Sequence, residues 1–125
     1  MEGKIKTALV IEDDENNMVL ITRLLEKSGY RTILAETGGQ GFDLAVQIKP
    51  DFIILDINLP DIDGTVVLKK IRASDMGSSV HVIVMTSFAM TGDREKYCAA
   101  GCDGYIEKPI DPHTVISQIR QIIGE

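Results

Sequence analysis

The sequence predicts an α/β protein in which strands and helices alternate around a parallel sheet. Three short apolar runs, at residues 8–11, 52–55 and 82–85, have the length and unbroken hydrophobicity of strands that are buried on both faces. Most of the segments between them carry apolar residues at helical spacing. Strict alternation with short connections is typical of a three-layer sandwich with right-handed crossovers.

The amino-terminal half of the chain supplies two strands and two helices. The first strand is expected over residues 6–12, and the helix over 15–28 carries apolar side chains three and four positions apart before a glycine ends it. The branched run at 31–36 follows as the second strand. The helix over 39–48 ends before Pro50, because proline cannot continue a helix.

The carboxyl-terminal half repeats the pattern. Strands are expected over residues 52–56, 80–86 and 103–107, and helices over 64–73, 92–100 and 112–123. The first of these helices carries valine, leucine and isoleucine at helical spacing, the last carries valine and isoleucine, and the middle one ends before Gly101.

Length and composition limit the class of protein. The 125 residues suit one domain, residues 1–125, that buries its own core. The net charge of −6 argues against a direct nucleic-acid surface, which needs clustered lysine and arginine. No apolar stretch approaches the roughly 20 residues of a membrane span, and the amino terminus lacks the apolar region of a signal peptide. We therefore expect a cytoplasmic protein with no membrane contact.

Cys98 and Cys102 flank the tripeptide Ala-Ala-Gly. We expect two reduced thiols that pack around a helix end in a reducing compartment. A disulfide or a metal pair has weak support, because a metal site would need two further soft ligands and the sequence offers no convincing candidates.

Charged and hydroxyl side chains stand at the carboxyl ends of four expected strands. Glu12 and Asp13 close the first, and Asp56, Thr86 and Lys108 close the third, fourth and fifth. Ligands of such sheets bind beyond these strand ends. Three carboxylates a few ångströms apart repel one another by kcal/mol amounts unless a cation lies among them. The sequence therefore predicts a magnesium-dependent site that handles a phosphoryl group.

Asp56 is the candidate nucleophile, because a carboxylate can accept a phosphoryl group as an acyl phosphate. Its alternative role is to cap the following turn. Phosphoryl transfer needs in-line positioning and neutralised equatorial oxygens. We expect Mg²⁺ to contact one of these oxygens, the Thr86 hydroxyl a second and Lys108 a third. The ion would use the strand-end carboxylates and the backbone carbonyl of Asn58, two residues past Asp56.

Three neighbouring positions have simpler alternatives. Lys108 precedes Pro109, and X–Pro bonds are the ones that adopt the cis form in proteins, although a surface lysine before a loop proline is the bland alternative. Asp14 is expected to cap the first helix. Tyr105 lies three residues before Lys108, beside the segment that carries Thr86, although most strand tyrosines only pack.

Four motifs together resemble the receiver domain (CheY-like) of bacterial two-component response regulators. They are Val10-Ile11-Glu12-Asp13-Asp14, Leu55-Asp56-Ile57-Asn58-Leu59-Pro60 followed by Asp63-Gly64, Met85-Thr86-Ser87-Phe88-Ala89, and Gly104-Tyr105-Ile106-Glu107-Lys108-Pro109-Ile110. The match runs from Lys6 to Ile123. The stretch Thr86–Asp93 resembles stand-alone receivers of the cell-division control type and the receivers of hybrid sensor kinases. Glu12 stands where aspartate is commoner in the family.

The resemblance implies a flavodoxin-like (βα)5 fold with a five-stranded parallel sheet of order 2-1-3-4-5. It implies a phosphorelay switch that catalyses its own phosphorylation and slow hydrolysis, rather than a conventional enzyme. Its implied site consists of Asp56 as phosphoacceptor, Glu12, Asp13, Asp56 and the Asn58 carbonyl as magnesium ligands, Thr86 and Lys108 on the phosphoryl group, and Tyr105 as switch aromatic.

The implied phosphodonor is a histidine kinase or a histidine phosphotransfer protein. The output would pass through the surface of the fourth helix, fifth strand and fifth helix to a downstream protein, and phosphorylation could form a dimer. On the first helix, an inward stripe of Asn17, Leu20, Ile21, Leu24 and Leu25 is expected to leave Met18 and Val19 facing solvent. They would either help to dock the donor or be two ordinary exposed apolar residues.

Rival classes fit the residues less well. An aspartyl-phosphate phosphatase of the haloacid-dehalogenase group needs a second aspartate two positions after the nucleophile, where this chain has Asn58, and a cap for which it has no room. A flavodoxin-like cofactor binder has its phosphate loop after the first strand, where the acids 12–15 would repel phosphate. A receiver that is never phosphorylated stays open. A receiver module cut from a longer regulator or hybrid histidine kinase stays open too, although the chain ends favour a stand-alone protein.

Overall fold

Five strands and five helices alternate along the chain in the computed structural model, which describes residues 5–75, 79–87 and 93–125. The strands are β1 (Thr7–Ile11), β2 (Arg31–Ala35), β3 (Phe52–Asp56), β4 (His81–Thr86) and β5 (Gly104–Glu107). The helices are α1 (Glu15–Lys27), α2 (Gly38–Ile48), α3 (Gly64–Arg72), α4 (Asp93–Ala100) and α5 (Val115–Ile123). Phe88 and Ala89 of the third motif lie outside the described residues.

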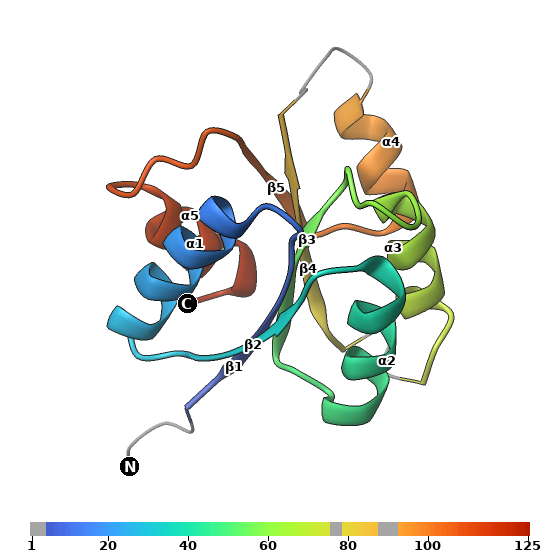
Figure 1. Ribbon diagram of the computed structural model, residues 1–125, viewed down its shortest axis with the longest axis horizontal. Coiled ribbons are helices and arrows are strands. Elements are labelled where there is room, and N and C mark those ends of the chain that lie inside the picture. Colours follow the sequence, from blue (N-terminus) through green and yellow to red (C-terminus); the bar gives the residue numbers. More distant parts are fainter. Residues whose placement is uncertain (1–4, 76–78, 88–92) are drawn as a thin grey trace.

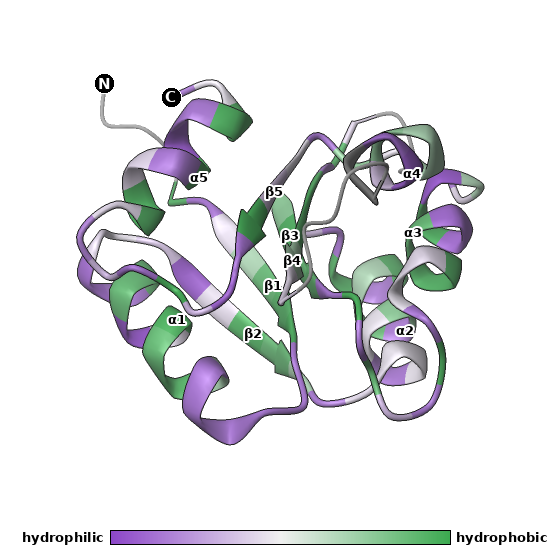
Figure 2. Cartoon of the chain, turned by 90° about the horizontal axis from the view of Figure 1, so that it is seen from above, coloured by the Kyte–Doolittle hydropathy of each residue, from purple (hydrophilic) through white to green (hydrophobic). Residues whose placement is uncertain are grey.

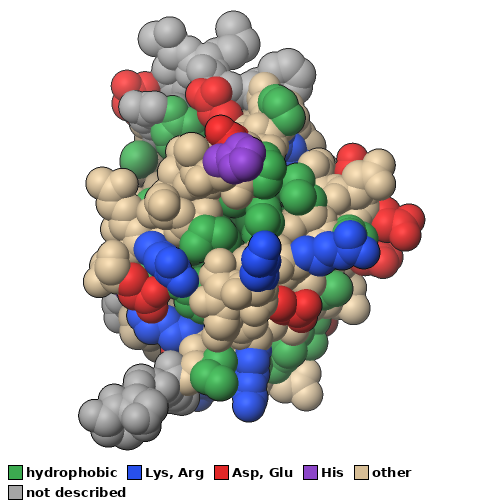
Figure 3. Space-filling model, turned by 90° about the vertical axis from the view of Figure 1, so that its left-hand side faces the viewer, with side chains coloured by type: hydrophobic (Ala, Val, Ile, Leu, Met, Phe, Trp, Pro, Cys, Tyr) green, Lys and Arg blue, Asp and Glu red, His purple; other side chains and the backbone are tan. Residues whose placement is uncertain are grey.

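The strands form one parallel sheet in the order β2-β1-β3-β4-β5, which confirms the predicted order and fold class. Helices α1 and α5 cover one face, and α2, α3 and α4 cover the other (Figures 1 and 2). On the outer surface of the α1–α5 layer, lysine and arginine side chains stand among hydrophobic ones (Figure 3). None of the described helices is long and apolar enough to span a membrane.

The central strands are buried on both faces, which explains their unbroken apolar runs. All five residues of β3 are buried. Alternate side chains enter different cores: Ala8 and Val10 pack with α1 and α5, whereas Leu9 and Ile11 pack with α2 and α3. The edge strand β2 is more exposed and carries the polar residues that a buried strand could not.

Backbone pairing continues one residue beyond the carboxyl ends of β1, β3 and β5. The Glu12 amide donates to Ala35 O over 3.0 Å, the Ile57 amide to Met85 O over 3.1 Å, and the Lys108 amide to Thr86 O over 2.9 Å. Parallel pairing thus fixes the backbone of the predicted site residues at one edge of the sheet.

Helix ends follow local chemistry. Asp14 Oδ1 accepts hydrogen bonds from the amides of Asn16 and Asn17, so its predicted role as the cap of α1 is confirmed.

Helix α5 begins at Val115 rather than at the predicted residue 112. The carbonyl of Asp111 accepts from the amides at 114 and 115, and its Oδ1 accepts from His113 N, which makes a turn of the residues before the helix.

The predicted inward stripe of α1 was partly wrong. Met18 is buried, with 8% of its surface exposed, and packs with Ile21 and Leu25 in the core. Positions 18, 21 and 25 are three and four residues apart, so they share the face that the helix turns toward the sheet. Val19 is 40% exposed, as predicted.

Both cysteines carry free thiols. Cys98 is exposed on α4, and Cys102 is half-buried just beyond the end of that helix. Burial, and then the neighbouring Cys98, raise the pKa of the Cys102 thiol to about 12.

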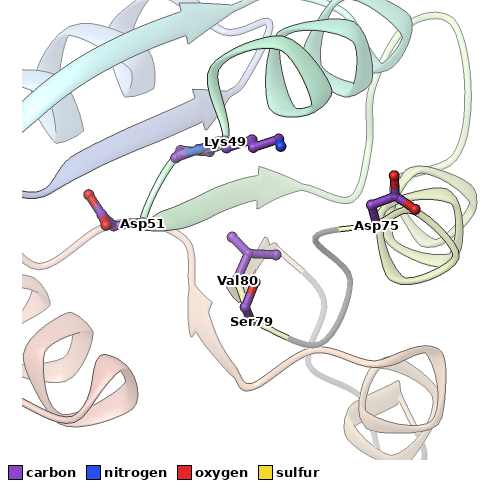
Figure 4. Close-up of a pocket in the computed structure, with 6 residues that line it drawn as sticks. Lys49, Asp51, Asp75, Ser79 and Val80 are labelled. Atoms are coloured by element: carbon purple, nitrogen blue, oxygen red, sulfur yellow. The ribbon is translucent and has the colours of Figure 1, made fainter.

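At the amino-terminal edge of the sheet, a hollow of about 400 Å³ is lined by Lys49, Pro50, Asp51, Asp75, Ser79 and Val80 (Figure 4). Its strand-end carboxylate, Asp51, already accepts a hydrogen bond from Thr7 N over 2.7 Å. The grouped acids lie instead at the carboxyl edge.

Candidate functional site

Three carboxylates gather at the carboxyl edge of the sheet. Glu12, Asp13 and Asp56 each offer an oxygen, and these oxygens all lie within 4.8 Å of one another. Glu12 and Asp56 are buried, whereas Asp13 is exposed. Among the described residues, this is the one group of three or more His, Cys, Asp or Glu side chains that is close enough to hold a metal ion.

Lys108 reaches into this cluster. Its Nζ lies 2.7 Å from Glu12 Oε1 and 3.3 Å from Asp56 Oδ1, and only 13% of the side chain is exposed. The Lys108–Pro109 peptide bond is cis. The lysine is therefore a partner of the carboxylates rather than a surface residue.

The cluster has an excess of negative charge. The pKa of the Glu12 carboxyl is raised from 4.5 to about 7, first by burial and then by its contact with Asp56, while Lys108 acts in the opposite direction. Burial lowers the pKa of the Lys108 ammonium, but the contact with Glu12 and the charge of Asp56 outweigh it and leave the pKa raised. One ammonium does not neutralise three carboxylates.

The donor set fits a small divalent cation. Glu12 Oε2 accepts a hydrogen bond from Asp14 N over 3.2 Å. Glu12 Oε1 is buried and, despite the nearby ammonium, no donor of the described residues points at it with hydrogen-bond geometry. This oxygen is paired with the Lys108 ammonium at 2.7 Å but accepts no directed hydrogen bond, so it keeps a lone pair that can bind a cation. Because Mg²⁺ prefers carboxylate and carbonyl oxygens, Glu12, Asp13 and Asp56 are suitable ligands for it.

The remaining predicted residues lie on β4, on β5 and in the loop after β3. Thr86 is buried at the end of β4, and Tyr105 is half-buried on the adjacent strand β5. Asn58 N donates to Asp56 Oδ1 over 3.1 Å, which orients the carboxylate. The Asn58 side chain is exposed, and the role of its carbonyl as a metal ligand stays a prediction.

Sequence reasoning missed one acid near the site. Asp61 lies in the loop after β3, and its two carboxylate oxygens bind the amides of Gly38 and Gly39 at the start of α2. The sequence feature that could have predicted this contact is the glycine pair Gly38-Gly39 at a helix start, because glycine allows another segment to approach the backbone closely.

The fold and the site define a class of protein. The chain belongs to the response regulator receiver domain family, whose family model matches residues 8–120. Receiver domains are signalling switches of two-component systems rather than conventional enzymes.

Individual relatives cover nearly the whole chain. The chain is 40% identical over 120 residues to the polar-differentiation response regulator DivK of Brucella anthropi, covering 96% of this chain and 98% of that protein. Similar DivK proteins from Brucella ovis and Brucella suis are 39% identical.

Solved structures agree. The receiver domain of sensor histidine kinase PA1611 from Pseudomonas aeruginosa, solved with a magnesium ion in its active-site cleft, has a TM-score of 0.88 and 32% identity, and the match covers 98% of this chain and 100% of that one. The chemotaxis response regulator CheY4 of Vibrio cholerae has a TM-score of 0.90 with 21% identity over 95% of this chain and 99% of that one, a likeness of fold.

A cation should stabilise the folded protein. Mg²⁺ at ten times its Kd should add about 1.4 kcal/mol to the free energy of unfolding by mass action. Asp13→Asn should raise the melting temperature in EDTA, because it removes one of the repelling charges, and should reduce the response to Mg²⁺. Calorimetric melting with and without Mg²⁺ measures both effects. Glu15→Gln, an exposed acid outside the cluster, is the matched control. No change in either experiment would contradict the site.

The raised pKa of Glu12 predicts a dependence of stability on pH. The folded protein holds the Glu12 proton more tightly than the unfolded chain, so this contribution is complete below pH 4.5 and is lost as the pH rises toward 7. By pH 8 the loss should be on the order of 3 kcal/mol. In urea titrations with EDTA, the stability of Glu12→Gln relative to wild type should therefore increase between pH 4.5 and pH 8. A difference that is constant over this range would show that Glu12 titrates normally.

Proposed function

We propose that this chain is a phosphorelay switch in which Asp56 accepts a phosphoryl group from a phosphohistidine donor. The observation that carries the proposal is the buried Asp56 carboxylate, which lies 3.3 Å from the Lys108 ammonium and shares a cluster with two further acids. The likeness to DivK proteins and to a magnesium-containing receiver supports the same function.

The reaction needs few groups from the protein. An Asp56 carboxylate oxygen forms a bond to phosphorus, and the bond from phosphorus to the donor imidazole nitrogen breaks, with its electron pair staying on that nitrogen. The Asn58 amide holds Asp56 in place, and Lys108 contacts a phosphoryl oxygen. Mg²⁺, held by Glu12, Asp13, Asp56 and the Asn58 carbonyl, would neutralise charge on the phosphoryl group. The same groups would serve the slow hydrolysis of the acyl phosphate, so the chain catalyses its own phosphorylation and dephosphorylation.

Phosphorylation would be transmitted by Thr86 and Tyr105. The new charge draws the Thr86 hydroxyl inward, and the Tyr105 ring takes the space that opens. Tyr105 borders a hollow of about 530 Å³ that is also lined by Cys98 of α4 and by Gln118 and Ile122 of α5, so a change of its position alters the α4–β5–α5 surface. That surface would bind the downstream protein or a second copy of the chain.

The remaining assignments follow from this function. Residues 1–125 form a single receiver domain that works in the cytoplasm, with no direct contact to nucleic acid or membrane. A receiver module of a longer regulator or hybrid kinase is the second candidate, because the receiver of a sensor histidine kinase is 32% identical to this chain.

The donor would dock beside the site. Val19 and Leu34 are about 40% exposed, and together with the edge of buried Met18 they line a hollow of about 510 Å³ that also reaches Glu12 and Asp13. Apolar side chains next to the phosphoacceptor would guide the donor histidine toward Asp56. Because Met18 belongs to the core, Val19 rather than Met18 is the residue with which to test docking.

Asp56 should be the modified residue. Phosphoramidate or acetyl phosphate with Mg²⁺ should add one phosphoryl group to the wild-type chain and none to Asp56→Ala, because the variant lacks the nucleophile. Intact-mass spectrometry followed by peptide mapping measures the modification. Asp75→Asn, an exposed acid away from the cluster, should behave as wild type. Equal labelling of Asp56→Ala would place the nucleophile elsewhere.

Val19→Glu should slow transfer from the protein donor alone. A charge in the apolar contact should reduce the rate from the histidine kinase or phosphotransfer protein that phosphorylates wild type by about tenfold, at a cost of about 1.4 kcal/mol. Phosphorylation by phosphoramidate should be unchanged, because that small donor needs no docking surface. Val46→Glu, 45% exposed on α2, is the matched control. Unchanged transfer to Val19→Glu would exclude this docking surface.

A further inference from the structure

The loop between β3 and α3, residues 57–63, begins directly after the phosphoacceptor and is fastened at its base by its own backbone. Gly64 N donates to Ile57 O over 2.9 Å. Asn58 and Asp63 pair as an isolated antiparallel bridge. The two ends of the loop are therefore held together directly after β3.

The tip of this loop is fastened to a different element. Asp61 Oδ1 accepts a hydrogen bond from Gly38 N over 2.7 Å, and Oδ2 accepts one from Gly39 N over 2.9 Å. A carboxylate is favoured here because the first amides of a helix have no partner in the helix and carry partial positive charge. The hydrogen bonds from Gly39 and then Gly38 hold the pKa of Asp61 below its usual value, so the side chain is a carboxylate at neutral pH.

Apolar packing reinforces this contact. A Cβ atom at Gly38 would lie 2.6 Å from Ile62 Cγ1 and 2.8 Å from Val67 Cγ2, so only glycine lets α2 approach the loop and α3 this closely. The start of α2 is therefore held against the loop by a charged residue and by its apolar neighbour.

The two acids of the loop serve different helices. Asp63 Oδ1 accepts hydrogen bonds from Thr65 N over 2.8 Å and from Thr65 Oγ1 over 2.7 Å, which caps α3. Asp61 binds α2 instead. The loop is thus bound to two helices: Asp61 binds the start of α2, and Asp63 binds the start of α3.

The binding of the loop to these two helices affects the carboxylate cluster. Asn58 is separated from Asp61 by only two residues, and its amide donates to Asp56 Oδ1 over 3.1 Å. A shift of the loop tip would therefore move the Asn58 backbone relative to the three carboxylates.

We propose that Asp61 is a positioning residue for the cation site: by binding the first amides of α2, it holds the loop so that the Asn58 backbone faces the carboxylate cluster. The proposal rests on the proposed function, since it concerns the affinity of that site for Mg²⁺. Asp61 acts through the loop and contacts neither the cation nor the phosphoryl group. Helix α2 thereby becomes part of the support of the site, with the packing of Ile62 on Gly38 beside the Asp61 hydrogen bonds.

The test compares two changes at the same end of α2. Asp61→Ala removes the link to the loop, whereas Thr37→Ala removes the other side-chain cap of α2, in which Thr37 Oγ1 accepts from Gln40 N over 3.1 Å without involving the loop. Both variants should lower the melting temperature in EDTA, each by about 4 °C. Isothermal titration calorimetry of the full chain with MgCl₂ should show a Kd about tenfold weaker for Asp61→Ala only.

Two further measurements separate positioning from a general loss of structure. Asp61→Asn keeps one acceptor oxygen and should show an intermediate Kd for Mg²⁺. With phosphoramidate, the Mg²⁺ concentration that gives half the maximal phosphorylation rate should rise for Asp61→Ala. The rate at saturating Mg²⁺ should stay within about twofold of wild type, because Asp56 and Lys108 are untouched.

The possible outcomes are distinct. If Asp61→Ala binds Mg²⁺ as tightly as wild type, the proposal is overturned while the phosphorelay function stands. Equal weakening by Thr37→Ala would also overturn it, since any loosening of α2 would then suffice. If wild type itself neither binds Mg²⁺ nor is modified at Asp56, the proposed function fails, and the role of Asp61 fails with it.

Discussion

The organisation of this protein depends on mutual repulsion among acids at one edge of its sheet. Parallel pairing brings Glu12 and Asp56 together at neighbouring strand ends, and Asp13 adds a third carboxylate within 4.8 Å. Burial makes this repulsion stronger than it would be in water. The Lys108 ammonium offsets part of it from the end of the outer strand. A divalent cation would offset the rest, so the electrostatic excess that lowers stability also creates affinity for a ligand.

The repulsion among these acids also explains why backbone hydrogen bonds and a loop fix the positions of the few charged side chains. The backbone hydrogen bonds that extend β1, β3 and β5 by one residue fix where each charged group begins. The loop after β3 then fixes Asp56 through the Asn58 amide and is tied to α2 through Asp61. Because these charges lie only a few ångströms apart, small displacements of their supports change the interaction energy of the whole cluster.

Glu12 distinguishes the charge cluster of this receiver from one with the commoner aspartate. Its side chain is longer by one methylene than the aspartate that is commoner at this position, and it makes the 2.7 Å contact with Lys108, whereas Asp56 lies 3.3 Å from the same ammonium. The lysine is thus held mainly by Glu12 rather than by Asp56, the proposed phosphoacceptor. In the proposed function, both cation binding and phosphorylation would add charge next to this contact.

The sequence alone predicted the fold class, the order of elements and the gathering of four charged residues at one edge of the sheet. Unbroken apolar runs identified the buried strands, and because parallel strands share a carboxyl edge, Glu12, Asp13, Asp56 and Lys108 could be placed together before any coordinates. The tertiary structure decided what local patterns do not encode. Met18 is buried because the packing of α1 on the sheet, rather than the helical spacing of apolar residues alone, selects the inward face. The link from Asp61 to α2 spans 23 positions in the chain, and only the packing of the loop against Gly38 makes it visible, since no spacing rule relates a loop acid to a distant helix start.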